Sequence, residues 1–117
     1  MAENILLDKS YKFALRIVKL SEYLNGEKKE YVLSRKVLDS GTAVGVFIEE
    51  ARQSPEHTEF ISKYSLANKE AFKTNFWLRL LRDSEYIGQN LAASLVADCE
   101  ELQKLLIRSL KTARRKE

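Results

Sequence analysis

The sequence predicts an all-α protein, folded as an antiparallel up-and-down four-helix bundle. Apolar residues recur at the three- and four-residue spacing of a helical face in four successive segments. One proline and four glycines in 117 residues leave little material for loops. No segment shows the apolar–polar alternation of a strand bounded by turns. At this length we expect a single domain, residues 1–117.

The first two predicted helices cover residues 8–24 and 30–53. Asp8 is a suitable N-cap for the first, and Asn25-Gly26 ends it, with the glycine in the left-handed conformation. The inward stripe of the first helix is Phe13, Ile17, Leu20 and Leu24. That of the second is Leu33, Val37, Ser40, Val44, Ile48 and Ala51.

The last two predicted helices cover residues 55–82 and 89–115. Ser54 is expected to cap the third helix, with Pro55 at its first position, where the missing N–H costs nothing. The stripe of the third helix is Phe60, Tyr64, Ala67, Ala71, Thr74, Leu78 and Leu81, broadened by Phe72, Phe76 and Trp77. That of the fourth is Leu95, Cys99, Leu102, Leu106 and Leu110. A short connection over residues 83–89 contains Gly88.

Two glycines, Gly41 and Gly45, lie on one face of the second predicted helix, in a stretch with a single charge, Asp39, between residues 37 and 48. A helical glycine costs about 1 kcal/mol relative to alanine, so their presence indicates the close approach of another backbone. One interpretation is a tight crossing inside the bundle. The other adds a contact between subunits, because a helix that is apolar all round is buried all round. The predicted oligomer interface is Gly41, Val44, Gly45 and Phe47.

Basic residues gather in two places. The last predicted helix carries Lys104, Arg108, Lys111 and Arg115 as a stripe away from its leucines, with Arg114 as a further cation of the same segment. The first carries Lys12, Arg16 and Lys19 beside its core face. One interpretation is a solvated surface, with the cations of the last helix stabilised by its C-terminal dipole. The other is a surface that contacts nucleic-acid phosphates without reading sequence. We take these eight residues as the candidate nucleic-acid site.

The residues favour a non-enzymatic protein. His57 is the only histidine, and Cys99, the only cysteine, falls in an apolar stripe. The Glu-x-x-His motifs of di-metal bundles and the glycine-rich phosphate loop are absent. We therefore expect no catalytic residue, metal or cofactor. The lone cysteine, the N-terminus and the short apolar runs favour a cytoplasmic protein without membrane contact.

Two motifs resemble those of a known family. The first reads SGTAVGVFIEEA over residues 40–51, and the second combines RQS at 52–54, Phe60, ANKEA at 67–71 and WLRLL at 77–81; YKFA at 11–14 also fits. On these motifs the chain resembles the four-helix-bundle proteins encoded in 23S rRNA intervening sequences and the related accessory protein of diversity-generating retroelements. Three positions depart from the family pattern: Ala43 replaces a serine, Phe47 an asparagine and Lys73 an acidic residue.

The resemblance implies a homopentamer with a role beside nucleic acid, and it allows a reverse transcriptase or another protein as partner. Together with the basic residues it predicts an oligomeric accessory protein that binds structured RNA or DNA, or a nucleoprotein partner. The alternative is a protein–protein interaction scaffold with no nucleic-acid role.

Overall fold

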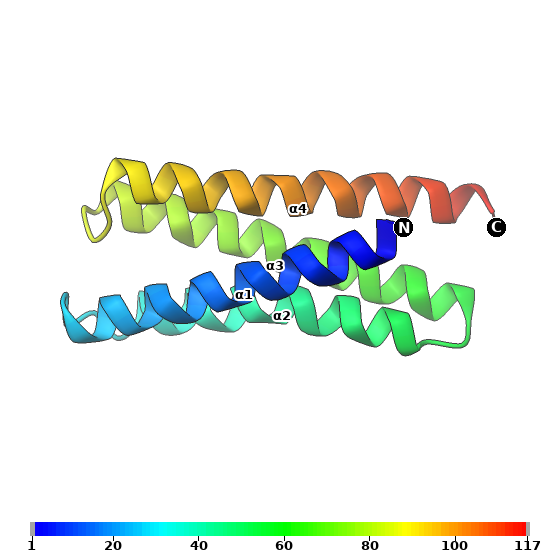
Figure 1. The fold of residues 1–117 in the computed structure, drawn as a ribbon, viewed down its shortest axis with the longest axis horizontal. Coiled ribbons are helices and arrows are strands. Elements are labelled where there is room, and N and C mark those ends of the chain that lie inside the picture. The colour runs from blue at the N-terminus through cyan, green and yellow to red at the C-terminus, as the bar shows by residue number, and fades with distance from the viewer. Residues whose placement is uncertain (1, 117) are drawn as a thin grey trace.

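The computed structural model describes residues 2–116, and it confirms the predicted four-helix bundle. Its helices are α1 (Ala2–Gly26), α2 (Leu33–Gln53), α3 (His57–Asp83) and α4 (Gln89–Arg115), and no strand occurs among these residues. The bundle measures 47 × 21 × 19 Å. Figure 1 shows the α1–α2 and α3–α4 connections at one end, and the α2–α3 connection with the start of α1 and the end of α4 at the other.

The four helices form a closed square. Contacts join α1 to α2, α2 to α3, α3 to α4 and α1 to α4, so α1 and α3 occupy opposite corners, as do α2 and α4. The α1–α4 contact is the smallest of the four. In Figure 1, α1 runs obliquely across the other helices. The exposed sides of α1 and α3 therefore face in opposite directions.

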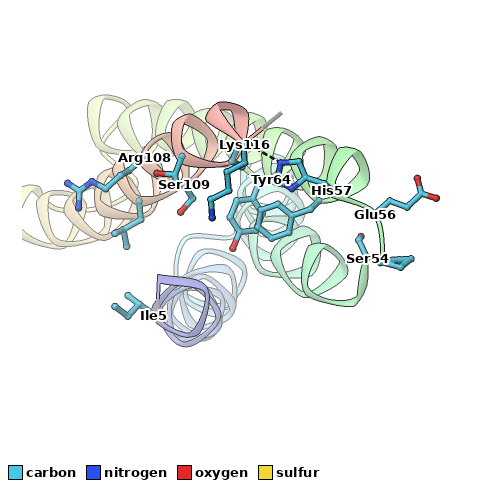
Figure 2. Close-up of a pocket in the computed structure, with 13 residues that line it drawn as sticks. Ile5, Ser54, Glu56, His57, Tyr64, Arg108, Ser109 and Lys116 are labelled. Atoms are coloured by element: carbon cyan, nitrogen blue, oxygen red, sulfur yellow. Dashed lines mark hydrogen bonds between the residues drawn. The ribbon is translucent and has the colours of Figure 1, made fainter.

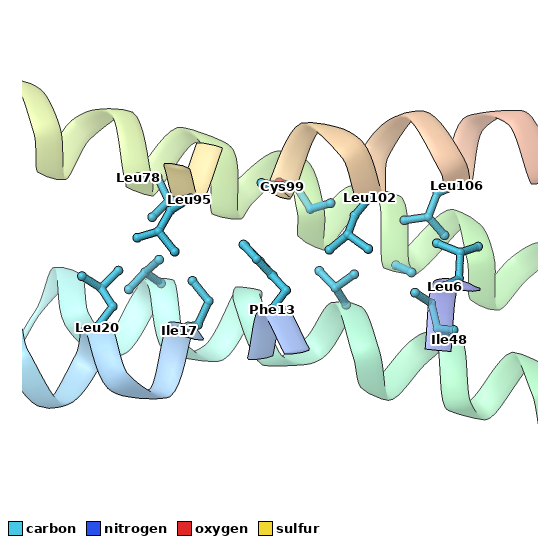
Figure 3. Close-up of a cluster of buried hydrophobic side chains, with 14 of the residues drawn as sticks. Leu6, Phe13, Ile17, Leu20, Ile48, Leu78, Leu95, Cys99, Leu102 and Leu106 are labelled. Carbon is cyan, nitrogen blue, oxygen red and sulfur yellow. The ribbon is translucent and has the colours of Figure 1, made fainter. Parts of the chain in front are cut away.

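The predicted stripes form the core. Every predicted stripe residue is buried except Leu33 and Phe60, which are partly buried. Figure 3 shows these side chains meeting along the bundle axis, with Leu6, Ile48 and Leu106 gathered toward one end. Burial of a leucine, isoleucine or phenylalanine side chain contributes about 1.5–3 kcal/mol, so this core is the main source of stability.

The predicted start of the first helix is wrong. The helix α1 begins at Ala2, because its apolar stripe extends one turn further through Leu6, which is fully buried. Asp8 is consequently an interior helical residue, and its carboxylate Oδ2 lies 3.0 Å from Nζ of Lys12. The Asp8 side chain, which was expected to cap the helix, therefore pairs with Lys12 one turn further along the same helix.

The α1–α2 turn also differs from prediction. Gly26 has a negative φ, and the left-handed residue is Lys29, with φ of 54°. Glu30 does not begin α2. Instead its carboxylate accepts hydrogen bonds from the backbone N–H groups of Val32, Leu33 and Ser34, at 3.3, 3.0 and 2.8 Å. Glu30 thereby satisfies backbone donors that no helical carbonyl can reach.

The α2–α3 turn reverses the role expected of Ser54. Its hydroxyl donates to the carbonyl of Glu50, 2.9 Å away, so Ser54 closes α2 instead of capping α3. Pro55 lies in the turn, and α3 begins two residues later at His57. In the α3–α4 turn the left-handed residue is Glu85, with φ of 66°.

Two phenylalanines that were expected to broaden the core are instead exposed. Phe72 and Phe76 point outward from α3, and only Trp77 is partly buried. The α2-facing flank of the α3 stripe carries Trp77, with the Lys36 ammonium 5.6 Å from its ring. The other flank faces α4, where Asn75 donates to Oε1 of Gln103 over 3.1 Å, so both phenylalanines are left on the outer side of α3.

Candidate nucleic-acid interface

The cations of α4 form a stripe on its outer face, which we call the α4 basic stripe: Lys104, Arg108, Lys111 and Arg115. Their four- and three-residue spacing places them opposite the buried leucines, and all four are exposed. None of them forms an ion pair with an acidic side chain in the part of the chain that the structure describes. Their charges are therefore available to an external anion.

Arg114 departs from this stripe and turns toward α3. Its Nη2 donates to the hydroxyl of Ser65 over 3.3 Å. There the α3–α4 groove holds a shallow hollow of about 430 Å³ that Arg114 shares with Lys111 and with Lys69 of α3. Lys69 was not predicted, because only the packing of α3 on α4 brings it beside these residues.

The cations of α1 are largely neutralised. Nη1 of Arg16 lies 2.7 Å from Oδ2 of Asp98, which belongs to α4, and Lys12 pairs with Asp8 within its own helix. Lys9 pairs likewise with Glu101 of α4, at 3.3 Å. Lys19 alone of the three predicted α1 cations is exposed without an ion pair among residues 2–116.

The two basic stripes do not merge into one surface. Asp98 and Glu101 of α4 face α1 and bind its cations, so acidic groups lie on the side of α4 toward the α1 stripe. Exposed pairs of this kind contribute about 0–1 kcal/mol to stability. They also lower the positive potential on that side of the bundle. The candidate interface therefore narrows to the C-terminal half of α4.

The glycines of α2 provide a tight crossing within the chain. A β carbon at Gly41 would lie 2.9 Å from two side-chain carbons of Ile17, and one at Gly45 would lie 3.6 Å from the backbone oxygen of Ser10. Val44 is fully buried. Phe47 is partly buried, with the Lys63 ammonium of α3 5.8 Å from its ring. The first interpretation of these glycines is confirmed; a role of this segment between subunits stays a prediction.

Exposed apolar rows on α1 and on α3 were not predicted as candidate interfaces. The α1 apolar row is Tyr11, Leu15 and Val18, and the α3 apolar row is Phe72, Phe76 and Leu80. Leu15 and Phe76 are 51% and 49% exposed, although each lies in the middle of its helix. The signal was present in the sequence: Leu15 and Phe76 each lie two positions from a buried stripe residue, about 200° around the helix, so both rows fall on the outer face.

The two residues considered for catalysis have structural partners. Nε2 of His57 lies 2.8 Å from the carbonyl oxygen of Ala113, joining the start of α3 to the end of α4. The thiol of Cys99 is buried and donates to the carbonyl of Ala71 over 3.2 Å. Burial away from water raises the pKa of this thiol to about 12, so it stays protonated at neutral pH.

The structure defines this protein as an antiparallel four-helix bundle. The chain belongs to the family described as 23S rRNA-intervening sequence proteins, which it matches over residues 2–108. It is also similar to a crystal structure from Bacteroides thetaiotaomicron, of a protein with unknown function from the S23 ribosomal protein family. The identity is 44% over 95% of this chain and 99% of that chain, with a TM-score of 0.94. No curated protein matches.

The described residues contain no helix that is both long enough and apolar enough to cross a membrane.

Proposed function

We propose that this protein is a non-enzymatic accessory protein that binds structured RNA or DNA through the α4 basic stripe. The observation that carries the proposal is the difference between the two sets of cations. Arg16 and Lys12 of α1 are held by carboxylates, whereas Lys104, Arg108, Lys111 and Arg115 project from α4 without acidic partners among residues 2–116. Membership of a family described by a ribosomal RNA intervening sequence supports a partner of this kind.

The geometry suits a phosphate backbone better than base edges. The stripe runs from Lys104 to Arg115, eleven helical steps or about 16 Å at 1.5 Å per residue. Four cations in a row along that length match a line of phosphates, and each neutralised phosphate releases condensed counterions. For duplex DNA we expect the logarithm of the affinity to fall with the logarithm of salt concentration at a slope of about −3.6 per protomer.

The test is fluorescence anisotropy of a labelled structured RNA titrated at low and at physiological salt. One variant replaces Lys104, Lys111 and Arg115 by alanine. Arg108 is left in place because it also lines a cavity described below. The control replaces Lys28, Arg35 and Arg52 by alanine; these are exposed cations without ion pairs in the described chain, and their removal makes the same change in net charge.

We expect the α4 variant to weaken binding and to reduce the salt slope by about 3 units, in proportion to the contacts removed. The control should lose much less. Equal losses in both variants would mean that only net charge matters. No binding by the unaltered protein at low salt would reject the nucleic-acid function and leave the scaffold alternative.

The proposal includes self-assembly, and the apolar rows support it. The α1 apolar row and the α3 apolar row are different surfaces on opposite corners of the bundle. A contact between the α1 row of one protomer and the α3 row of the next is heterologous, and repetition of such a contact closes into a ring when the rotation allows it. A ring is the form that a pentamer takes, and it would bring several α4 stripes into one positive field.

Substitutions on the two rows distinguish this heterologous assembly from assemblies that use other contacts between subunits. Leu15→Glu impairs one row and Phe76→Glu impairs the other, so each variant alone should be monomeric by light scattering. Mixed together they retain one intact row each and should form a species with the mass of two chains. Asn90→Glu adds the same charge outside both rows and should keep the assembled mass.

The outcome of this mixing identifies the type of contact. If only one variant loses mass, the contact joins like rows and is isologous. If both variants keep the assembled mass, neither row is the contact, and the α2 residues Gly45 and Phe47 become the surface to test.

A further inference from the structure

A cavity of about 680 Å³ opens at one end of the bundle and is lined by residues of α1, α3, α4 and the α2–α3 turn. It lies at the end that also holds the α2–α3 turn. Ile5 of α1 lines one side, Phe60 and Tyr64 of α3 another, and Leu105 and Ser109 of α4 a third. Its volume falls in the range of about 300–1,000 Å³ that small-molecule sites occupy.

The cavity wall on α3 is aromatic. The rings of Phe60 and Tyr64 lie with centroids 4.4 Å apart at an interplanar angle of 34°. The ring of His57 is parallel to that of Phe60 within 7°. The hydrogen bond between His57 and the carbonyl of Ala113 holds that ring in place. Tyr64 is only 1% exposed and supports Phe60 from behind, so the partly buried Phe60 ring is the aromatic surface that a ligand can reach. Such a surface favours a planar ring, because base–aromatic stacking contributes about 1–3 kcal/mol.

The polar groups at the cavity favour an anion. Figure 2 shows Lys116 extending over the space between Ser109 and Tyr64, and the Ser109 side chain on the same side of the opening. Glu56, the acidic residue of the described lining, points away from this space. Arg108 lines the same cavity with its guanidinium directed outward. The opening is therefore positive and offers an ammonium and a hydroxyl donor.

We propose that this cavity binds a mononucleotide unit, with the base against the partly buried Phe60 and Leu105 and the phosphate at Lys116 and Ser109. The chemistry needed is a planar ring attached to an anion, and both halves of the cavity are required to recognise it. The site goes beyond the proposed phosphate-backbone contact, because it uses residues outside Lys104, Lys111 and Arg115. The unit can be a free nucleotide or the end of a strand, and the experiment distinguishes these sources.

The test is isothermal titration calorimetry of the full chain with AMP, and separately with adenosine and with ribose 5-phosphate. We expect AMP to bind with a Kd below about 1 mM and each partial ligand to bind at least about tenfold more weakly. Absence of heat with millimolar AMP would overturn the proposal. So would equal affinity for AMP and ribose 5-phosphate, since a ring-independent anion could bind anywhere on the basic surface.

Two matched substitutions locate the binding. Ser109→Glu places a carboxylate at the opening, and Ser94→Glu makes the same change at an exposed site near the start of α4. AMP affinity should fall at least about tenfold in the first variant and stay unchanged in the second. Equal affinities in the two variants would overturn the assignment. If Ser109→Glu fails to fold, Lys116→Ala replaces it, and this variant should weaken AMP but not adenosine.

RNA binding by the α4 basic stripe and AMP binding in the cavity can be tested independently. The Lys104, Lys111 and Arg115 alanine variant should keep its AMP affinity even where it loses RNA, and loss of AMP binding in that variant would overturn the cavity assignment. The source of the nucleotide follows from a short single strand of adenylates titrated into Ser109→Glu. A matching loss of strand affinity supports a strand end in the cavity. An unchanged strand affinity, with AMP binding lost, supports a free nucleotide there.

Discussion

Gly41 of α2 packs directly against Ile17 of α1, and this contact determines how closely the two helices approach. A β carbon at position 41 would lie 2.9 Å from both Cγ1 and Cγ2 of Ile17 and 3.3 Å from its Cβ. These atoms lie next to the backbone of a β-branched residue, so they cannot swing aside. Gly45, one turn further along α2, has more room, since its nearest neighbours are atoms of Ser10 at 3.6 Å.

We therefore expect opposite effects from two identical substitutions. Gly41→Ala gains about 1 kcal/mol of helix propensity but incurs overpacking of about 1–3 kcal/mol, for a net loss of stability. Gly45→Ala gains the same propensity at an ordinary contact distance and should be neutral or stabilising. Urea unfolding followed by circular dichroism measures both. A stabilised Gly41→Ala variant would show that α1 can move away from α2 at little cost.

The buried hydroxyls of Ser40 and Thr74 join α2 to α3 across the core. Their oxygens lie 2.8 Å apart, and Thr74 is also 2.8 Å from the carbonyl oxygen of Glu70. Ser40→Ala and Thr74→Val should each cost about 1 kcal/mol, because each removes the hydrogen bond between the two hydroxyls. The remaining hydroxyl keeps a backbone carbonyl as partner, that of Glu70 for Thr74 and that of Val37 for Ser40. The double variant should cost less than the sum of the single losses. Additive losses in a double-mutant cycle would indicate that the two hydroxyls do not depend on each other.

Glu30 is expected to act as the cap of α2. Its carboxylate accepts three backbone hydrogen bonds at the start of the helix. Glu30→Ala should destabilise the protein by about 1 kcal/mol, as loss of a helix cap does. Glu27→Ala, which removes an exposed carboxylate from the same turn, is the matched control and should have little effect. Thermal unfolding of the two variants, side by side, checks the difference.

Because of Cys99, we expect the free energy of unfolding to fall at alkaline pH. Burial raises the pKa of its thiol in the folded protein from 9.0 to about 12. The unfolded chain therefore loses this proton first, and the contribution of Cys99 to stability is complete below pH 9 and lost as pH rises from 9 toward 12. Over that window the free energy of unfolding should fall more steeply for the unaltered protein than for Cys99→Ala. Parallel pH profiles would contradict this.

The same burial predicts slow thiol chemistry. At pH 8 a thiol reagent should modify Cys99 in the folded protein only as fast as the protein opens, because the thiolate is scarce and the sulfur is inaccessible. In urea the reaction should be rapid. Rapid modification of the native protein, with circular dichroism unchanged, would show that the core around Cys99 is accessible.

The sequence predicted the inner face of each helix well because periodicity reports burial directly. Ile17, Val44, Leu78 and Leu102 are all at most 1% exposed, as their stripes require. The helix ends were less predictable. Turn residues compete for the same backbone groups, and Lys29 took the left-handed position that Gly26 was expected to hold. Local preference is a small free energy that a tertiary contact easily outweighs.

The candidate site was only partly predictable for a related reason. The spacing of Lys104, Arg108, Lys111 and Arg115 placed them correctly on one outer face. Nothing in the sequence showed that Asp98 would bind Arg16, because the two residues are separated by 82 positions. The cavity could not be predicted either, because its lining residues come from three helices and a turn that are far apart in the sequence.

The small contact between α1 and α4 has a consequence for motion. Hairpins of neighbouring helices hold α1 to α2, α2 to α3 and α3 to α4, whereas the α1–α4 side relies on less packing and on exposed pairs such as Arg16 with Asp98. The free energy of local opening rises with the amount of buried contact, so we expect the α1–α4 interface to open before the other three helix interfaces. Backbone amides at this interface should exchange with deuterium faster than those between α2 and α3.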